Sequence, residues 1–336
     1  MRVALLAHEQ FPDRAKTAVG VLRYSDHDIV AVLDRDSAGD TVHDYLPDVQ
    51  DAPIVDEMAD VPDCDALVIG IAPIGGGFDD SWRPDVRTAI ERRCDVIAGL
   101  HYLLSEDDEF CELAAEYDVS LRDVREPPED LTVAEGTAGE IDAHVVLTVG
   151  TDCSTGKMTT SYELRDAARE RGLDAAVAPT GQTGIMVSGW GIAIDRTIAD
   201  FAAGATERLV KEADAEDVII VEGQGALTHP AYSGVTTAIL HGAQPDSLVL
   251  CHEAGRETVG SYDSFELPDP ATYANLYEQV TEPVSPATVD AGVLNTYDLS
   301  VDEADAALSE YEAELGVPVT DPVRYDAGDI LDSILD

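Results

Sequence analysis

Short apolar runs alternate with longer amphipathic segments along most of the chain. In the first part, the runs Val3 to Ala7, Ile29 to Leu33 and Ala66 to Ile71 are each followed by polar turns or helical periodicity. Runs that are apolar at successive positions are typical of strands buried on both faces, and strands that alternate with helices form parallel sheets. The pattern therefore predicts an α/β protein with doubly wound sheets.

The alternation lapses once and then resumes. Residues 123–142 are rich in Pro, Gly and acids, which predicts a linker. We therefore expect a Rossmann-like parallel-sheet domain over residues 1–142, including that linker, and a second parallel-sheet domain over residues 143–336. After the first strand, the sequence His8-Glu9-Gln10-Phe11-Pro12 replaces the glycine-rich dinucleotide fingerprint, which argues against an NAD site in the first domain.

The second domain begins with a strand, a glycine-bounded turn and a helix, over Val145 to Arg171. Backbone amides of such a turn, the positive end of the helix and a lysine together favour phosphate binding. Five residues separate Gly150 from Gly156, one more than usual, and Met158 separates Lys157 from Thr159. A plain glycine turn is the alternative, but the chain has only three lysines, Lys16, Lys157 and Lys211, and one occupies the position that the motif requires. The expected contacts to a cofactor are Gly150, Thr151, Asp152, Cys153, Ser154, Thr155, Gly156, Lys157, Met158 and Thr159. The second domain is thus predicted to be P-loop NTPase-like.

Polar residues follow the other strands of this domain, where the carboxyl ends of parallel strands should meet at one edge. Glu222 ends an apolar strand, as the acid of a Walker-B-like strand does, and it can hold Mg²⁺ or act as a base; the alternative is a glutamate that caps the next turn. The other candidates at this edge are Thr180, Gln182, Thr183, His229, Tyr232, His252, Arg256 and Asn295.

The composition of the chain tells more about the environment in which the protein works than about its binding partner. Acidic residues outnumber basic ones by 68 to 20, giving a formal net charge of −48, and the acids are dispersed. Dispersed acids with little lysine favour a surface adapted to molar salt, and they disfavour nucleic acid and anionic membranes as ligands. Five widely spaced cysteines indicate neither a disulfide framework nor a zinc site. Because we find neither a leader nor an apolar run near 20 residues, we expect a cytoplasmic protein.

Several ordered motifs resemble the DgcN family: GTDCSTGKMTT (150–160), TGQTGIM (180–186), IDRTIADFAAG (194–204), VEGQGALTHPAYSG (221–234) and LCHEAGR (250–256). The resemblance covers essentially the whole chain. It implies a Rossmann-like domain followed by a P-loop domain, and D-glutamate N-acetyltransferase activity with acetyl-CoA in D-amino acid catabolism. A more distant similarity to dethiobiotin synthetase implies that Asn295 contacts adenine. Thr180-Gly181-Gln182 stands where that second family has a lysine-bearing segment, which argues against carboxylation of a diamine.

These observations combine into one hypothesis with alternatives. Lys157 and the loop amides would hold the phosphates of CoA, and Glu222 or His229 would take the proton from the amine. Thr183 or Tyr232 would stabilise the oxyanion, while Arg256, Thr180, Gln182 and His252 would contact the substrate.

An ATP-dependent ligase or kinase, with Mg²⁺ held by Thr159 and Glu222, is the main alternative, and a nucleotide-binding regulator without turnover is another. On the first hypothesis no metal is needed. We expect the partners to be small molecules and the assembly to be a homo-oligomer.

Overall fold

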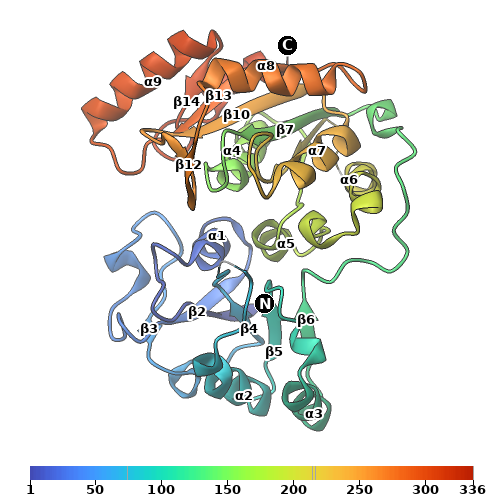
Figure 1. The fold of residues 1–336 in the computed structure, drawn as a ribbon. Helices are drawn as coiled ribbons and strands as arrows, with labels where there is room; N and C mark the ends of the chain where they lie inside the picture. The colour runs from blue at the N-terminus through green and yellow to red at the C-terminus, as the bar shows by residue number, and fades with distance from the viewer. Residues whose placement is uncertain (74, 214, 216, 336) are drawn as a thin grey trace. The chain divides into compact units, whose positions relative to one another are not determined.

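The first sheet explains the early apolar runs. In the structure, a computed structural model that describes residues 1–73, 75–213, 215 and 217–335, six parallel strands lie in the order β3-β2-β1-β4-β5-β6 (Figure 1). Their bounds are Ile54–Val55 (β3), Asp28–Leu33 (β2), Arg2–Leu6 (β1), Ala66–Ile69 (β4), Asp95–Ala98 (β5) and Leu121–Asp123 (β6). The strand order reverses between β1 and β4, where Val3 pairs with Ala66. This is the order of a Rossmann-like sheet, as predicted.

The unit around this sheet contains a segment that the sequence assigned elsewhere. Its helices are α1 (Lys16–Tyr24), α2 (Arg83–Glu91) and α3 (Asp108–Tyr117), and it comprises Met1–Pro127 together with Gln182–Ala193. The second segment carries α5 (Gln182–Ser188), in which the Thr183 hydroxyl lies 2.9 Å from that of Thr17. The guanidinium of Arg125 donates to Gln182 Oε1 at 2.7 Å. The expectation that Gln182 and Thr183 belong to the second domain is therefore wrong, because α5 buries its apolar side chains against the first unit.

The second sheet is also parallel, with the order β14-β13-β10-β7-β9-β8. Its strands are Val319–Thr320 (β14), Thr288–Asn295 (β13), Ser247–Glu253 (β10), His144–Gly150 (β7), Val218–Val221 (β9) and Ala175–Ala178 (β8). The central strand β7 pairs with β10 on one side and β9 on the other. Two six-stranded parallel sheets confirm the predicted α/β fold class.

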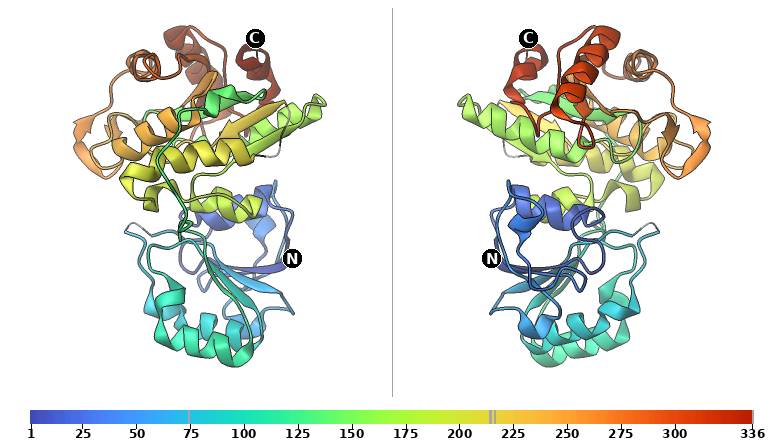
Figure 2. Two further views of the ribbon diagram at one scale, coloured as in Figure 1. Left: turned by 90° about the vertical axis from the view of Figure 1, so that its right-hand side faces the viewer. Right: turned by 90° about the vertical axis from the view of Figure 1, so that its left-hand side faces the viewer.

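Helices cover both faces of the second sheet (Figure 2). Helices α4 (Lys157–Glu170) and α10 (Gly328–Leu335) form a core with Val146, Ile220 and Val293 on one face. Tyr311 of α9 (Val301–Leu315) packs beside Gly292 on the opposite face and donates to the carbonyl of Leu250 at 3.1 Å. This unit also contains α6 (Ala199–Glu212), α7 (Ser233–Ala243), α8 (Pro270–Thr281) and the hairpin β11 (Thr258–Val259) and β12 (Tyr262–Glu266).

The predicted linker is divided between the two units, and the chain passes from one to the other at Pro127 and Pro128 instead of near residue 142. Glu207 of α6 is buried and accepts hydrogen bonds from the backbone amides of Glu135, Gly136 and Thr137. It also pairs with Lys211 one turn later. An acidic, Pro-rich and Gly-rich sequence can be ordered when a buried carboxylate satisfies its amides.

We expect Glu207→Ala to destabilise the second unit by roughly 2–4 kcal/mol, because the substitution removes the acceptor of three backbone amides and one of the partners of the Lys211 ammonium. Urea unfolding in molar KCl would measure the loss. Glu212→Ala, which removes an exposed acid paired with Arg208 on the same helix, should change stability by less than about 1 kcal/mol. Equal effects of the two substitutions would contradict the role of Glu207.

The same contact should depend on pH. Burial by itself raises the pKa of Glu207, but the hydrogen bonds from Lys211, Gly136 and Thr137 outweigh it and lower that pKa from 4.5 to about 2. Its contribution to stability is therefore complete above pH about 4.5 and is lost as the pH falls toward 2. The difference between wild type and Glu207→Ala should shrink over that interval.

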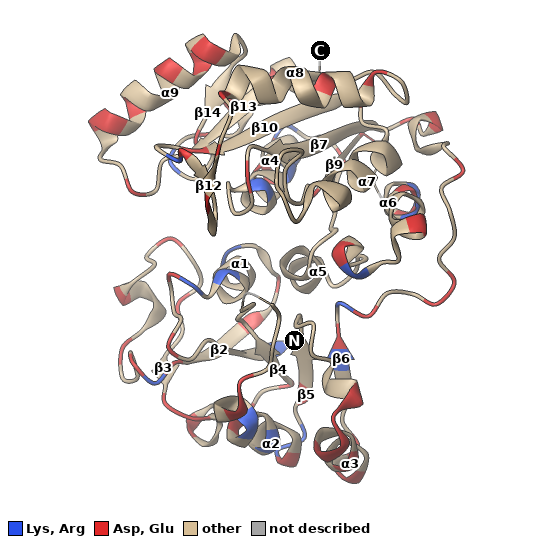
Figure 3. Cartoon of the chain, in the orientation of Figure 1, with Lys and Arg blue, Asp and Glu red and all other residues tan. Residues whose placement is uncertain are grey.

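Acidic residues are spread over the helices and loops of both units (Figure 3). No helix in the described parts of the chain combines the length and apolar character needed to cross a bilayer.

Candidate functional site

The phosphate loop connects the central strand of the second sheet to α4. A Cβ atom on Gly150 would lie 2.7 Å from the Thr155 hydroxyl and 2.8 Å from Lys157 Nζ, so a side chain at this position would collide with the loop. Gly156 has a φ of 101° and Ser154 one of 58°, both left-handed. The lengthened loop thus folds back on itself, and glycine is required where it starts and favoured where it ends.

Lys157 lies inside this loop and not in solvent. Only 6% of the residue is exposed, and its ammonium donates to the carbonyl of Asp152 at 2.6 Å. Its stem passes the backbone of Gly223, where an added Cβ would lie 3.3 Å from Lys157 Cδ. Helix α4 begins at this residue without a side-chain cap, so its positive end is available to an anion beside a buried cation.

Glu222 follows β9, the strand next to β7, and is 5% exposed. Its carboxylate accepts from the Gly181 amide at 3.3 Å, and its carbonyl accepts from the Thr180 hydroxyl at 2.6 Å. Gly223 allows this approach, because a Cβ there would lie 1.7 Å from the carbonyl oxygen of Thr148. The structure thus brings Glu222, Thr180 and the phosphate loop to one edge of the sheet.

His229 is 2% exposed, and its hydrogen bonds define its tautomer. Nδ1 accepts from the backbone amides of Ala231 and Tyr232, at 3.1 and 3.2 Å, so in the neutral ring Nε2 carries the proton. Desolvation lowers the pKa of His229 and outweighs the negative charge of Asp152, which acts to raise it. The lowered pKa favours the neutral ring. Nε2 points toward Asp152 Oδ1 at 3.8 Å. In this tautomer, His229 is a hydrogen-bond donor at Nε2 and has no lone pair there for a substrate proton.

Asp152, Cys153 and His229 are also close enough to suggest a metal site, with their potential ligand atoms within 4.8 Å of one another. The tautomer does not suit one, because Nε2 must lose its proton before it can coordinate a cation. Asp152 is already an acceptor for the Cys153 amide, the Arg256 guanidinium and the Gly260 amide. The hydrogen bonds from these three donors to the Asp152 carboxylate stabilise the loop.

Arg256 contacts three groups of the protein itself. Its guanidinium donates to Asp152 Oδ2 at 3.0 Å, to the carbonyl of Cys153 at 2.8 Å and to Glu253 at 2.6 Å. A carboxylate of the substrate would have to displace these partners. Arg256 therefore connects the turn between β10 and β11 to the phosphate loop through these hydrogen bonds.

The last two strand ends carry His252 and Asn295. His252 Nδ1 lies 2.8 Å from the Thr151 hydroxyl, and burial lowers the pKa of this imidazole to about 4, so the ring is neutral near pH 7. Asn295 lies beside Glu253 in the register of β10 and β13, and its Oδ1 accepts from the Tyr297 amide at 3.1 Å. Both residues therefore lie at the same edge as the loop, as expected.

Sequence reasoning missed the β11–β12 hairpin. The Gly260 amide donates to Asp152 at 2.7 Å, and the Tyr262 ring lies 5.4 Å from that of His229, centroid to centroid. Tyr232 lies 4.6 Å from the same imidazole and is 49% exposed. The alternation Thr258-Val259-Gly260-Ser261-Tyr262, with its glycine turn, was the available signal.

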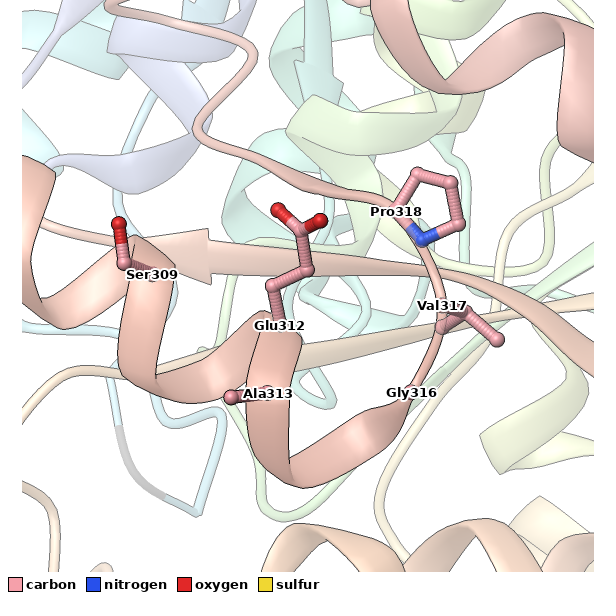
Figure 4. A pocket seen from close by; sticks show the side chains of 6 residues that line it. All are labelled: Ser309, Glu312, Ala313, Gly316, Val317 and Pro318. Carbon is pink, nitrogen blue, oxygen red and sulfur yellow. The ribbon is translucent and has the colours of Figure 1, made fainter.

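A separate hollow of about 470 Å³ lies at the opposite edge of this sheet (Figure 4). Residues of the α9 C-terminal turns and the approach to β14 line it, namely Ser309, Glu312, Ala313, Gly316, Val317 and Pro318. Because β14 starts here while the phosphate loop follows the end of β7, the hollow does not belong to the candidate site.

A parallel sheet whose central strand enters a glycine-bounded phosphate loop, with an acid after the neighbouring strand, defines a P-loop α/β protein. Residues 132–331 match the family model described as "Domain of unknown function (DUF1611_C) P-loop domain", and residues 35–127 match the corresponding "DUF1611_N" Rossmann-like domain. The chain belongs to this DUF1611 family.

Curated relatives carry an activity in their name, which confirms the family resemblance drawn from the motifs. A protein named D-glutamate N-acetyltransferase from Pseudoalteromonas sp. is 38% identical over 270 residues, 80% of each chain. A second, with the same name, from Tritonibacter scottomollicae is 36% identical over 279 residues, 83% of each chain. The crystal structure of a DUF1611 family protein from Anabaena variabilis is 38% identical, covers 99% of this chain and 98% of its own, and superimposes with a TM-score of 0.93.

Proposed function

We propose that the chain is an acyltransferase that moves an acetyl group from acetyl-CoA to the amine of D-glutamate. The observation that carries this proposal is a glycine-bounded loop with a buried lysine at an uncapped helix start, in a chain whose relatives bear the name D-glutamate N-acetyltransferase. CoA offers such a site a pyrophosphate and a 3′-phosphate. A net charge of −48 further suggests that the reaction takes place in a salt-rich cytoplasm.

We assign the cofactor contacts to residues at the carboxyl ends of the strands of the second sheet. Lys157 and the amides from Thr151 to Gly156 would hold phosphate oxygens. Asn295, with its Oδ1 engaged by Tyr297, would present its NH₂ group to the adenine. Tyr232 and Tyr262, both partly exposed beside His229, would offer aromatic surface to the apolar arm of the thioester.

The chemistry requires a base and a donor. We assign the base to Glu222, which would take a proton from the substrate ammonium so that the amine can attack the thioester carbonyl. The C–N bond then forms, the nitrogen loses a second proton, the C–S bond breaks, and the sulfur takes up a proton so that CoA leaves as the thiol. His229 Nε2–H would donate to the oxygen that becomes negative in between, a role that its tautomer permits.

A second candidate is an ATP·Mg-dependent ligase or kinase. The position of Glu222 after the strand beside β7 favours it, with Thr159 in the first turn of α4 as the other ligand of Mg²⁺. Under this alternative, Glu222 would hold a metal and would not take a proton.

Two measurements in molar KCl would separate these functions. We expect titration calorimetry to show micromolar binding of acetyl-CoA and none of ATP·Mg. Incubation with acetyl-CoA should give N-acetylglutamate from the D-enantiomer and at least 100-fold less from the L-enantiomer. Binding of ATP·Mg alone, without an acetylated product, would overturn the proposal in favour of the second candidate.

A further inference from the structure

Two cysteines of the first unit lie close together. Sγ of Cys64 and Sγ of Cys94 are 3.3 Å apart, although 30 residues separate them in the chain. Cys94 is buried and Cys64 is partly exposed, and both are free thiols. Their spacing in the sequence gave no sign of this pair.

The sheet itself produces the contact. Cys64 and Cys94 lie just before β4 and β5, which are parallel neighbours with Ala66 opposite Asp95. The backbone amide of Asp95 donates to the carbonyl of Asp65 at 2.9 Å, so the two approaches to the sheet are already bonded to each other. Continued back from Ala66 and Asp95, this register leaves Cys64 and Cys94 offset by one residue, and their side chains close the remaining distance to 3.3 Å between the sulfurs.

Arg92 connects the two segments that precede the cysteines. Its guanidinium donates to the carbonyls of Met58 and Val61, which attaches the segment before Cys64 to the turn before Cys94. The hydrogen bond from Cys64, together with Arg92, lowers the pKa of Cys94. The two sulfurs thus face each other in a fixed frame, with a cation close by.

We propose that Cys64 and Cys94 form a reversible disulfide when the protein meets hydrogen peroxide. One sulfur of the pair, as a thiolate, attacks the peroxide, breaks its O–O bond and becomes a sulfenic acid, with release of water. The other sulfur, 3.3 Å away, then attacks the oxidised one and gives up its proton, and the S–O oxygen leaves as a second water. Two thiols are oxidised, one peroxide is reduced, and the bond closes a loop across β4 and β5.

Thiol mapping of the full chain tests this proposal. After treatment with hydrogen peroxide and alkylation of the remaining thiols, we expect a non-reducing digest to contain one cross-linked peptide pair, joining Cys64 to Cys94. Its mass should be lower by two hydrogens, and dithiothreitol should abolish it. Cys111→Ser should give the same cross-link, whereas Cys64→Ser and Cys94→Ser should give none.

Stability provides a second readout. The oxidised protein should unfold at a temperature several degrees higher than the reduced one, because the disulfide restricts the unfolded chain. This difference should vanish in Cys64→Ser. Alkylation of both cysteines in folded, peroxide-treated protein, or cross-links that involve other cysteines instead, would overturn the proposal.

Discussion

Lys157→Ala should lower kcat/KM for acetyl transfer at least 100-fold, about 2.7 kcal/mol of lost transition-state stabilisation. The residue supplies the one ammonium of the phosphate loop, and a charge-assisted contact to phosphate inside a buried loop has no substitute there. Most of the loss should appear as a raised KM for acetyl-CoA. Steady-state assay of N-acetyl-D-glutamate would measure both constants.

Burial of Lys157 complicates the alanine variant, because the missing stem leaves space beside Gly223. Lys157→Met keeps most of the stem without the charge, so it should show the same kinetic loss with a smaller loss of stability. Lys16→Ala removes an exposed lysine from the first unit and should leave both constants within twofold. Normal turnover by Lys157→Met would refute the anion site.

Glu222→Gln should reduce kcat about 1,000-fold while KM for acetyl-CoA changes little. Glutamine keeps the size of the side chain and can still accept from the Gly181 amide, but it cannot take a proton from the substrate ammonium. Product formation should recover partly as the pH rises and free amine becomes available. A pH–rate series from 7 to 10 on both proteins would show the difference.

An exposed acid on another helix provides the control. Glu212→Gln should retain full activity, since that exposed carboxylate pairs with Arg208 on the same helix. If Glu222→Gln instead abolished binding of ATP·Mg and left acetyl transfer intact, Glu222 would be a metal ligand and the base would lie elsewhere.

Much of the architecture could be predicted from local patterns. Uniformly apolar runs indicated buried parallel strands, and the glycines at positions 150 and 156 indicated where the chain makes the tight loop of a P-loop domain. The carboxyl ends of parallel strands share an edge, so Glu222, His252 and Asn295 could be assigned to one site before their contacts were known.

Other features of the site depend on partners that are distant in sequence. An arginine at a strand end is as suitable for a substrate carboxylate as for an aspartate of the protein, and only the fold shows that Asp152 holds Arg256. The same applies to His229, a candidate base by type. Two backbone amides donate to its Nδ1, so that Nε2 carries the proton and is a donor. The sequence alone does not show these two hydrogen bonds.

The sequence by itself determined where the central strands and the long helices lie, since side-chain periodicity and glycine act through neighbouring residues. Tertiary structure alone decided that Gln182–Ala193 belong to the first unit and that Cys64 lies against Cys94. It also decided that the buried carboxylate of Glu207 orders the segment that the sequence predicts to be a linker. Those outcomes depend on which apolar surfaces and unsatisfied polar groups meet across long separations. Local propensity carries no information about such encounters.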